Sequence, residues 1–125
     1  MKTFREFELR GRAAWNTGSV DHHNSAVASG ASRVAGSLYS VIAPVPKVPP
    51  RIGEFNHSRL VVEGGVVEHW LNGTRVVRYE IAAPEVQKHL RELRKDDREI
   101  LLQGPLSLQN HSSEAWFRNV KVRVK

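Results

Sequence analysis

Two sets of side chains in this sequence have the types and spacing for chemistry on a polar ligand. In the first set, Gln109 and His111 are two residues apart and would share one face of a strand, with Arg118 following after a short turn. Histidine is the side chain best suited to move a proton near neutral pH, and Gln and Arg can orient a hydroxylated ligand. The alternative is structural, with Gln109 and His111 satisfying buried backbone groups in the turn over residues 110–114. The sequence leaves both interpretations open.

The second set is a tryptophan between two arginines. The dipeptide Asn72-Gly73 is a strong signal for a two-residue hairpin loop, and Gly64-Gly65 suits the preceding turn, because such turns need residues with φ > 0. Counting outward from the two loops places Arg59, Trp70 and Arg75 in one cross-strand row. Such a row can stack a ring on the indole and hold its hydroxyls with guanidinium groups. The alternative is a cation–π stack on an exposed sheet face, worth about 0.5–1 kcal/mol per pair.

The same count divides the strands of residues 53–78 into an apolar and a polar face. The count predicts that His69 pairs with Val76 and that Glu68 pairs with Val77 across the two strands. A slip of one residue would exchange the two faces, so the apolar set favours this register. A single histidine on the apolar face is predicted to be a core residue rather than a ligand. The apolar face holds Leu60, Val62, Val67, Leu71, Val76 and His69, and the polar face holds the row with Glu63, Glu68 and Tyr79 nearby.

The segments before these strands predict one further strand and two irregular stretches. Residues 4–15 alternate between apolar and charged side chains, which is typical of a half-buried strand. Residues 16–37 are small and polar and predict a long loop. Residues 38–52 hold most of the prolines and predict an extended surface segment that cannot be a central strand.

The segments after them predict one helix and two strands. Pro84 suits a first helical position, and apolar residues recur at i, i+4 and i+7, which predicts a helix near residues 84–95. Alternation predicts strands around Leu106–Leu108 and over Val120–Val124. Short strands separated by turns, with one helix, imply an all-β fold, an antiparallel β-sandwich or jelly roll, in a single domain over residues 1–125.

The composition limits the classes of partner. The net charge is +6, but the basic residues are scattered or interleaved with acids, and no motif of a nucleic-acid-binding fold is present, so we expect no nucleic-acid partner. No apolar run approaches the ~20 residues that span a bilayer, so we expect no membrane partner. The first residues, MKTFREFELRGR, lack the apolar core of a secretory signal.

Neither a metal nor a cofactor is expected. The chain has no cysteine, which excludes disulfides and thiolate metal sites. Asp21, His22 and His23 are adjacent, but neighbouring histidines on an extended segment point to opposite faces. The spacing therefore favours a solvated loop over a zinc site. The acids Glu63, Glu68, Glu80 and Glu114 include no pair of the kind that a two-carboxylate glycosidase needs.

Three segments of the chain resemble the 3-keto-disaccharide hydrolase domain family. They are HSRLVVEGGVVEHWLNGTRVV, the earlier GSLYSVIAP and the tail GPLSLQNHSSEAWFRNVKV, in the family's order. The combination of Gly-x-x-x-Leu-Gln-x-His and Phe-Arg-Asn with His-Trp-Leu-Asn-Gly is specific, whereas each motif alone is weak. The resemblance covers about residues 4–15 and 36–125.

The resemblance implies a concanavalin A-like, lectin/glucanase-type sandwich that acts on carbohydrate in bacterial glycan breakdown. It implies His111 as the catalytic acid and base. Family members are often secreted or periplasmic. The substrate-binding residues would be Gln109, Arg118, Trp70, Arg59, Arg75 and Tyr39.

The sequence departs from the family pattern in two places. The family's opening strands precede what is here Thr3, so we expect a sandwich that is incomplete at the N-terminus, with an unpaired sheet edge open to self-association. The family has a Glu-x-Gln-type motif after its Asn-Ser-Gly motif, whereas residues 16–37 contain neither Glu nor Gln. The chain is therefore predicted to hydrolyse a 3-keto-disaccharide or related glycoside, or to be a non-catalytic carbohydrate-binding module or a truncated, inactive member of the same fold.

Overall fold

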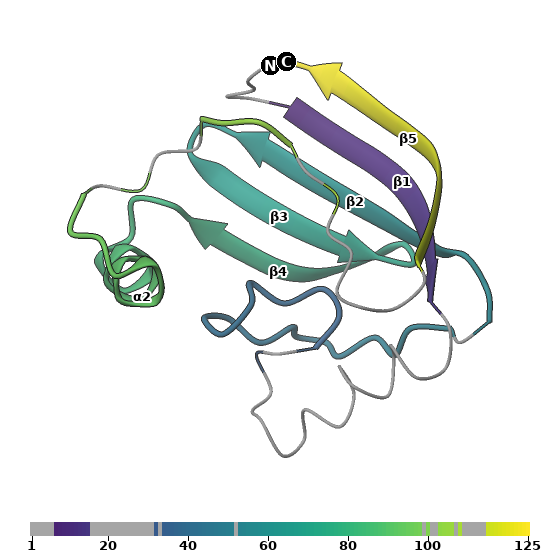
Figure 1. The fold of residues 1–125 in the computed structure, drawn as a ribbon, viewed down its shortest axis with the longest axis horizontal. Helices are drawn as coiled ribbons and strands as arrows, with labels where there is room; N and C mark the ends of the chain where they lie inside the picture. Colours follow the sequence, from purple (N-terminus) through teal and green to yellow (C-terminus); the bar gives the residue numbers. More distant parts are fainter. Residues whose placement is uncertain are drawn as a thin grey trace.

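Five strands form one antiparallel sheet in the computed structural model, which describes residues 7–15, 32, 34–51, 53–98, 100, 103–106, 108 and 115–125. The strands lie in the order β4-β3-β2-β1-β5. The first and the last strand of the sequence, β1 and β5, are therefore neighbours in the sheet (Figure 1). One short helix, α2, lies at one end of the sheet (Figure 1). The elements are β1 (Phe7–Trp15), β2 (Asn56–Glu63), β3 (Val66–Leu71), β4 (Thr74–Glu80), α2 (Pro84–Arg94) and β5 (Ala115–Val124).

The antiparallel β character and the one helix within the described residues are as predicted. The helix over Pro84–Arg94 matches the predicted range, and Lys95 ends it in the left-handed conformation with φ 53°. Within the described residues there is one sheet, and a second sheet of the predicted sandwich is not among them. The loop predicted over residues 16–37 lies outside the described residues as far as residue 31.

Both predicted hairpin turns are present, and they set the pairing near the turns. Asn72 and Gly73 have φ of 48° and 85°, and Gly64 and Gly65 have φ of 58° and 77°. Positive φ at both central residues gives the turn the twist of the flanking strands. The predicted pairs Arg59–Trp70 and Trp70–Arg75 are confirmed.

A β-bulge in β4 makes the predicted register wrong farther from the second turn. His69 pairs with Val77 rather than Val76, and Glu68 pairs with Arg78 rather than Val77. The extra residue lets two successive valines both be buried, with exposed fractions of 2% for Val76 and 4% for Val77. Two adjacent valines in a strand carry no signal that distinguishes a bulge from regular alternation. Counting residues outward from the turn could therefore not locate the bulge.

The bulge also moves Tyr79 to the apolar face, which corrects its predicted place on the polar face. Tyr79 pairs with Val67 and packs against the buried pair Val62 and Val67. Burial raises the pKa of its phenol to about 12. Tyr79 therefore belongs to the core and does not contribute to a polar site.

Two irregular segments cover the apolar face instead of a second sheet among the described residues. Residues 34–51 place Ala35, Ile42 and Val48 against the cluster of Leu71, Val76 and Val77. Farther along the sheet, Leu106 packs against Val62 and Val67, and its segment crosses the sheet in Figure 1. The proline-rich stretch is irregular and forms no central strand at its described residues, as predicted, but it begins with a tight turn in which Leu38 bridges Ile42 rather than as an extended segment.

No strand is formed at the described residues of the segment around Leu106–Leu108, where a strand was predicted. Pro105, Leu106 and Leu108 are irregular in the structure. Pro105 has no N–H to donate to a ladder, and Leu106 is drawn onto the sheet by its contact with Val62 and Val67. Leu106 therefore faces the sheet through this packing, whereas Leu108 is 54% exposed.

Strand β5 is one edge of the sheet and leaves apolar side chains exposed. Val120, Val122 and Val124 are 44%, 40% and 62% exposed. Val122 and Val124 pair with Leu9 and Phe7, which pair in turn with residues of the apolar face of β2. The apolar face therefore continues beyond the described segments that cover its centre. Self-association through this edge stays a prediction.

Candidate functional site

A row of basic residues with one tryptophan crosses the polar face of the sheet. The register aligns Arg75, Trp70, Arg59, Arg10 and Lys121 as successive Cα partners from β4 to β5. We call these five residues the cationic row. Successive strands are about 4.8 Å apart, so the row is about 19 Å long. The hairpin count found its first three members, whereas Arg10 and Lys121 join through pairings between segments that are distant in sequence.

Glu68 lies beside the row and holds two of its members in place. Its two carboxylate oxygens accept hydrogen bonds from Trp70 Nε1 and Arg75 Nη1, each at 3.0 Å. The bond from the Trp70 indole is the main cause that lowers the pKa of Glu68, with Arg75 and Arg78 contributing and partial burial opposing. Glu68 is therefore ionised at neutral pH, and its side chain orients the indole rather than donating a proton.

The guanidinium of Arg59 lies over the Trp70 ring, 5.1 Å from its centroid. This is one of the two cation–π contacts that the structural alternative predicts. The other is replaced by an ion pair, because Arg75 binds Glu68 at 3.0 Å. Trp70 is thus fixed by Arg59 through its ring and by Glu68 through its Nε1. A rigid aromatic ring between cations is the arrangement that both interpretations of the row require.

Arg118 lies on the same face as the cationic row. It pairs with Arg12, which is two residues from Arg10 in β1, so the register positions of Arg118 and Lys121 face the same side. The Arg118 guanidinium lies 3.9 Å from the centroid of the Phe55 ring. The sequence predicted that Arg118 acts with Gln109 and His111. In the structure, Arg118 lies on the face of the sheet that carries Arg59 and Trp70.

Trp116 is a further aromatic residue of this face by its register position. It pairs with Ala14, two residues beyond Arg12, and is 45% exposed. A bulge at Asn119, where φ is 54°, interrupts the alternation of side chains along β5. The sequence pattern alone therefore does not show on which face of the sheet Trp116 lies.

The other predicted site residues lie elsewhere or outside the described residues. Tyr39 is 56% exposed and belongs to the segment that packs on the apolar face, so the structure does not bring it together with Trp70. Gln109 and His111 lie outside the described residues, as do Asp21, His22 and His23.

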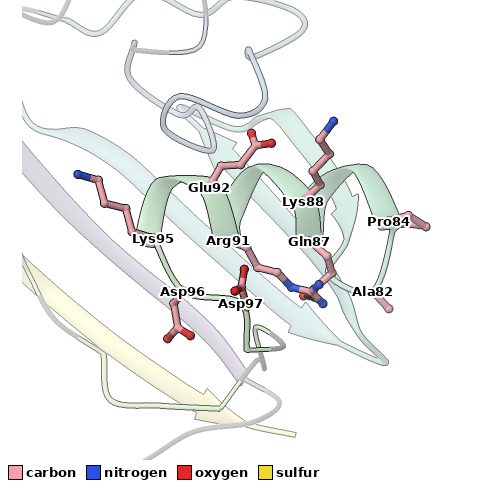
Figure 2. A pocket seen from close by; sticks show the side chains of 9 residues that line it. All are labelled: Ala82, Pro84, Gln87, Lys88, Arg91, Glu92, Lys95, Asp96 and Asp97. Carbon is pink, nitrogen blue, oxygen red and sulfur yellow. Dashed lines mark hydrogen bonds between the residues drawn. The ribbon is translucent and has the colours of Figure 1, made fainter.

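Two open depressions lie away from the cationic row. One, of about 620 Å³, runs beside α2, where Arg91 and Gln87 point to one side of the helix (Figure 2). Its buried Gln87 binds the carbonyls of Ile81 and Ile100 at 2.7 and 2.9 Å, which fastens the helix to the chain that follows it. The other, of about 470 Å³, lies between residues 41–42, the end of β4 and the start of α2. Neither is lined by a predicted site residue.

In the part of the chain that the structure describes, no three side chains of His, Asp or Glu come together as a group that would hold a metal ion. Over the same residues, no helix has the length and apolarity to cross a membrane.

His69 is a partnered histidine on the apolar face, as predicted. Its Nδ1 lies 2.9 Å from the Gly36 carbonyl oxygen, and its ring meets Tyr79 edge-on at 5.7 Å between centroids. Burial is the main cause that lowers the pKa of His69 below the ordinary 6.5, opposed by the backbone contacts with Gly36 and Ser37. His69 thus ties residues 36–37 to β3 in its neutral form.

We expect this histidine to make the protein less stable in mild acid. A folded-state pKa below the unfolded value means that the unfolded chain binds the extra proton more readily, so stability is complete above pH 6.5 and falls as the pH falls towards the folded value. Urea unfolding between pH 8 and pH 5 measures the loss. His69→Gln should flatten the curve in this window, and an equal pH dependence in both proteins would contradict the assignment.

Comparison with known proteins identifies relatives over nearly the whole chain. A family model described as "3-keto-alpha-glucoside-1,2-lyase-like domain" matches residues 5–123. A 3-keto-disaccharide hydrolase of Bacteroides thetaiotaomicron is 26% identical over 117 residues, which is 83% of this chain and 40% of that protein. The chain thus spans about two fifths of the length of this curated relative.

Solved structures show the same fold. A candidate glycosyl hydrolase from Parabacteroides distasonis superimposes with a TM-score of 0.73 at 19% identity, covering 98% of this chain and 73% of the other. A second such protein from the same organism gives a TM-score of 0.71 at 18% identity, covering 99% and 80%. At this identity the similarity concerns the fold and not the activity.

Proposed function

The chain belongs to the 3-keto-alpha-glucoside-1,2-lyase-like domain family, and we propose from this that it binds a 3-keto-disaccharide or related glycoside and cleaves its glycosidic bond. The names of the family and of the curated relative both describe action on 3-keto sugars. The observation that carries the proposal is the family match over residues 5–123 together with a fixed tryptophan between arginines on the polar face of the sheet.

The saccharide binds on the polar face in this proposal. The Trp70 ring offers an apolar surface for the C–H face of a pyranose, and the guanidinium groups of Arg59 and Arg75 donate hydrogen bonds to its hydroxyls. Glu68 keeps the indole in position through the bond from Nε1. Arg118 extends this binding surface, because its register position is on the same face.

The chemical step is assigned to His111 as acid and base, with Gln109 and Arg118 orienting the substrate. A ketone at C3 makes the proton on C2 acidic, so a base of near-neutral pKa can remove it while the oxygen at C1 leaves with a proton. Histidine performs both transfers near neutral pH. Water then adds across the resulting C1–C2 double bond, with its oxygen on C1 and a proton on C2, so that the net reaction is hydrolysis. Tyr39, on the other side of the sheet, has no assigned part in this step.

The domain as a whole is proposed to be a single concanavalin A-like sandwich over residues 1–125. The exposed valines of β5 support this, because an apolar face that continues to the sheet edge is the surface that a second layer covers in a sandwich. The edge of β5 is also the place where self-association would occur.

A second function, a carbohydrate-binding module without catalysis, is favoured by one observation. Glu68 is an acidic residue beside the cationic row, and both of its oxygens are engaged by Trp70 and Arg75. A carboxylate held in this way, with a lowered pKa, is a poor general acid at neutral pH. A binding module needs only the platform and the arginines, whereas the enzyme also needs the His111 set.

Incubation with a 3-keto-disaccharide separates the two functions. The enzyme should release the two monosaccharides in a time course followed by chromatography, and the unoxidised disaccharide should stay intact. His111→Ala should abolish release while binding persists. Saturable binding without release would establish the binding module, and the absence of both binding and release would overturn the proposal.

A further inference from the structure

We propose that the polar face selects saccharides that carry carboxylate groups, and that the cationic row is the basis of this selection. This inference rests on the proposed function, because it specifies the class of saccharide that the same face takes. Its physical basis is charge. The row places cations on the edge strands β4 and β5 and on the central strand β2, and the Trp70 platform lies between Arg59 and Arg75.

The described cations of the polar face outnumber its carboxylates. Besides Arg59 and Arg75, the same face carries Arg78 opposite Glu68 and, on β5, the exposed Arg118, Lys121, Arg123 and Lys125. By register position, β1 adds Arg10, Arg12 and Glu8 to this face, and its other described acids are Glu63, Glu68 and Glu80. Glu68 is neutralised by Arg75 and Glu63 by Lys125, which bonds it at 2.5 Å. The surplus is positive and lies towards β5.

A neutral saccharide does not account for such a surplus. One or two guanidinium groups are enough to hold the hydroxyls of a neutral sugar, whereas a sheet face with excess Arg and Lys carries a cost of like-charge repulsion unless anions neutralise it. Carboxylates on a sugar chain pair with guanidinium and ammonium groups through charge-assisted hydrogen bonds. The length of about 19 Å, from four strand spacings, suits several linked sugars rather than one.

The carboxylates on this face favour an acidic saccharide over a nucleic acid. A nucleic acid carries a negative charge at every nucleotide, and its phosphates offer no donor to Glu63 or Glu80. An acidic saccharide alternates carboxylates with hydroxyls, and the hydroxyls donate to carboxylates. The presence of both cations and acids on β2 to β4 matches the second pattern.

The probe is tetragalacturonate, with its fully methyl-esterified form as the uncharged counterpart of the same length and stereochemistry. Isothermal titration at 50 mM salt should give at least about tenfold tighter binding of the acid form, and raising the salt to 200 mM should remove much of this difference. Lys121→Gln should weaken binding of the acid form about three- to tenfold and leave binding of the ester unchanged. Lys121 is exposed, so this variant is expected to fold.

Lys88→Gln is the matched control. Lys88 is an exposed lysine of α2, at the end of the sheet, so the same loss of one charge should leave both affinities unchanged (Figure 1). Equal binding of acid and ester, or equal losses in Lys121→Gln and Lys88→Gln, would overturn the charge selection.

The same titrations distinguish failure of this inference from failure of the proposed function. If a 3-keto-disaccharide binds and tetragalacturonate does not, the inference is wrong and the proposed function stands. If no saccharide binds, and single-stranded DNA binds with an affinity that Lys121→Gln lowers, both the inference and the proposed function are wrong. The polar face is then a nucleic-acid-binding surface.

Discussion

Replacing Asn56 with aspartate is expected to lower the free energy of unfolding by about 3 kcal/mol, because the substitution turns a buried donor into an acceptor. Asn56 is fully buried. Its Nδ2 donates to the carbonyls of Arg51 and Glu54 at 2.9 and 3.2 Å. Its Oδ1 accepts from Arg51 N at 2.7 Å and from Asn72 Nδ2 at 2.9 Å. An aspartate would place an oxygen against two carbonyl oxygens and would bury its charge.

Urea denaturation at pH 7 measures this loss, and Asn119→Asp is the matched control. Asn119 is exposed on β5 with φ 54°, a conformation that Asp also tolerates. The control should change stability by less than about 0.5 kcal/mol. Equal losses in the two variants would mean that Asn56 does not fasten Arg51 and Glu54 to the Asn72 turn. Phe55, whose ring Arg118 covers, lies between Glu54 and Asn56, which the hydrogen bond from Asn56 Nδ2 joins.

Replacing Trp70 with alanine is expected to weaken saccharide binding about 10- to 100-fold. The variant removes the aromatic platform, which is worth about 1–3 kcal/mol where a ring stacks on a ligand. It also frees Arg59 and Glu68 from the contacts that position them. Titration with a 3-keto-disaccharide measures the change.

Two further variants separate the platform from the fold. Trp70→Phe keeps a ring and loses the Nε1 donor, so it should recover part of the affinity. Trp116→Ala removes an exposed tryptophan of the same face outside the cationic row and should have the smaller effect. Unchanged binding in Trp70→Ala, with an unchanged urea midpoint, would show that the saccharide binds elsewhere.

The sequence predicted the parts of the fold that local chemistry determines. Asn72-Gly73 and Gly64-Gly65 require φ > 0, and this alone placed Arg59, Trp70 and Arg75 in one row. Proline at residue 84 and apolar periodicity predicted α2 within one residue. These features depend on neighbours in the chain, so they need no knowledge of the tertiary structure.

The features that the sequence could not predict depend on contacts between distant segments. Two adjacent valines concealed the bulge that moves Tyr79 into the core. Arg10 and Lys121 join the row only because β1 lies between β2 and β5. The tie between His69 and Gly36 joins residues 33 positions apart. Gln109 and His111 remain predictions, since they lie outside the described residues.

The central claim, that the polar face binds a saccharide at Trp70, is tested most directly by the indole N–H signals in a ¹⁵N NMR titration. The chain has three tryptophans, and the Trp70 signal is identified by its loss in Trp70→Phe. Adding a 3-keto-disaccharide should shift the Trp70 indole, whose Nε1 donates to Glu68, in a saturable way. Saturable binding of the saccharide with the Trp70 signal unmoved would contradict the account.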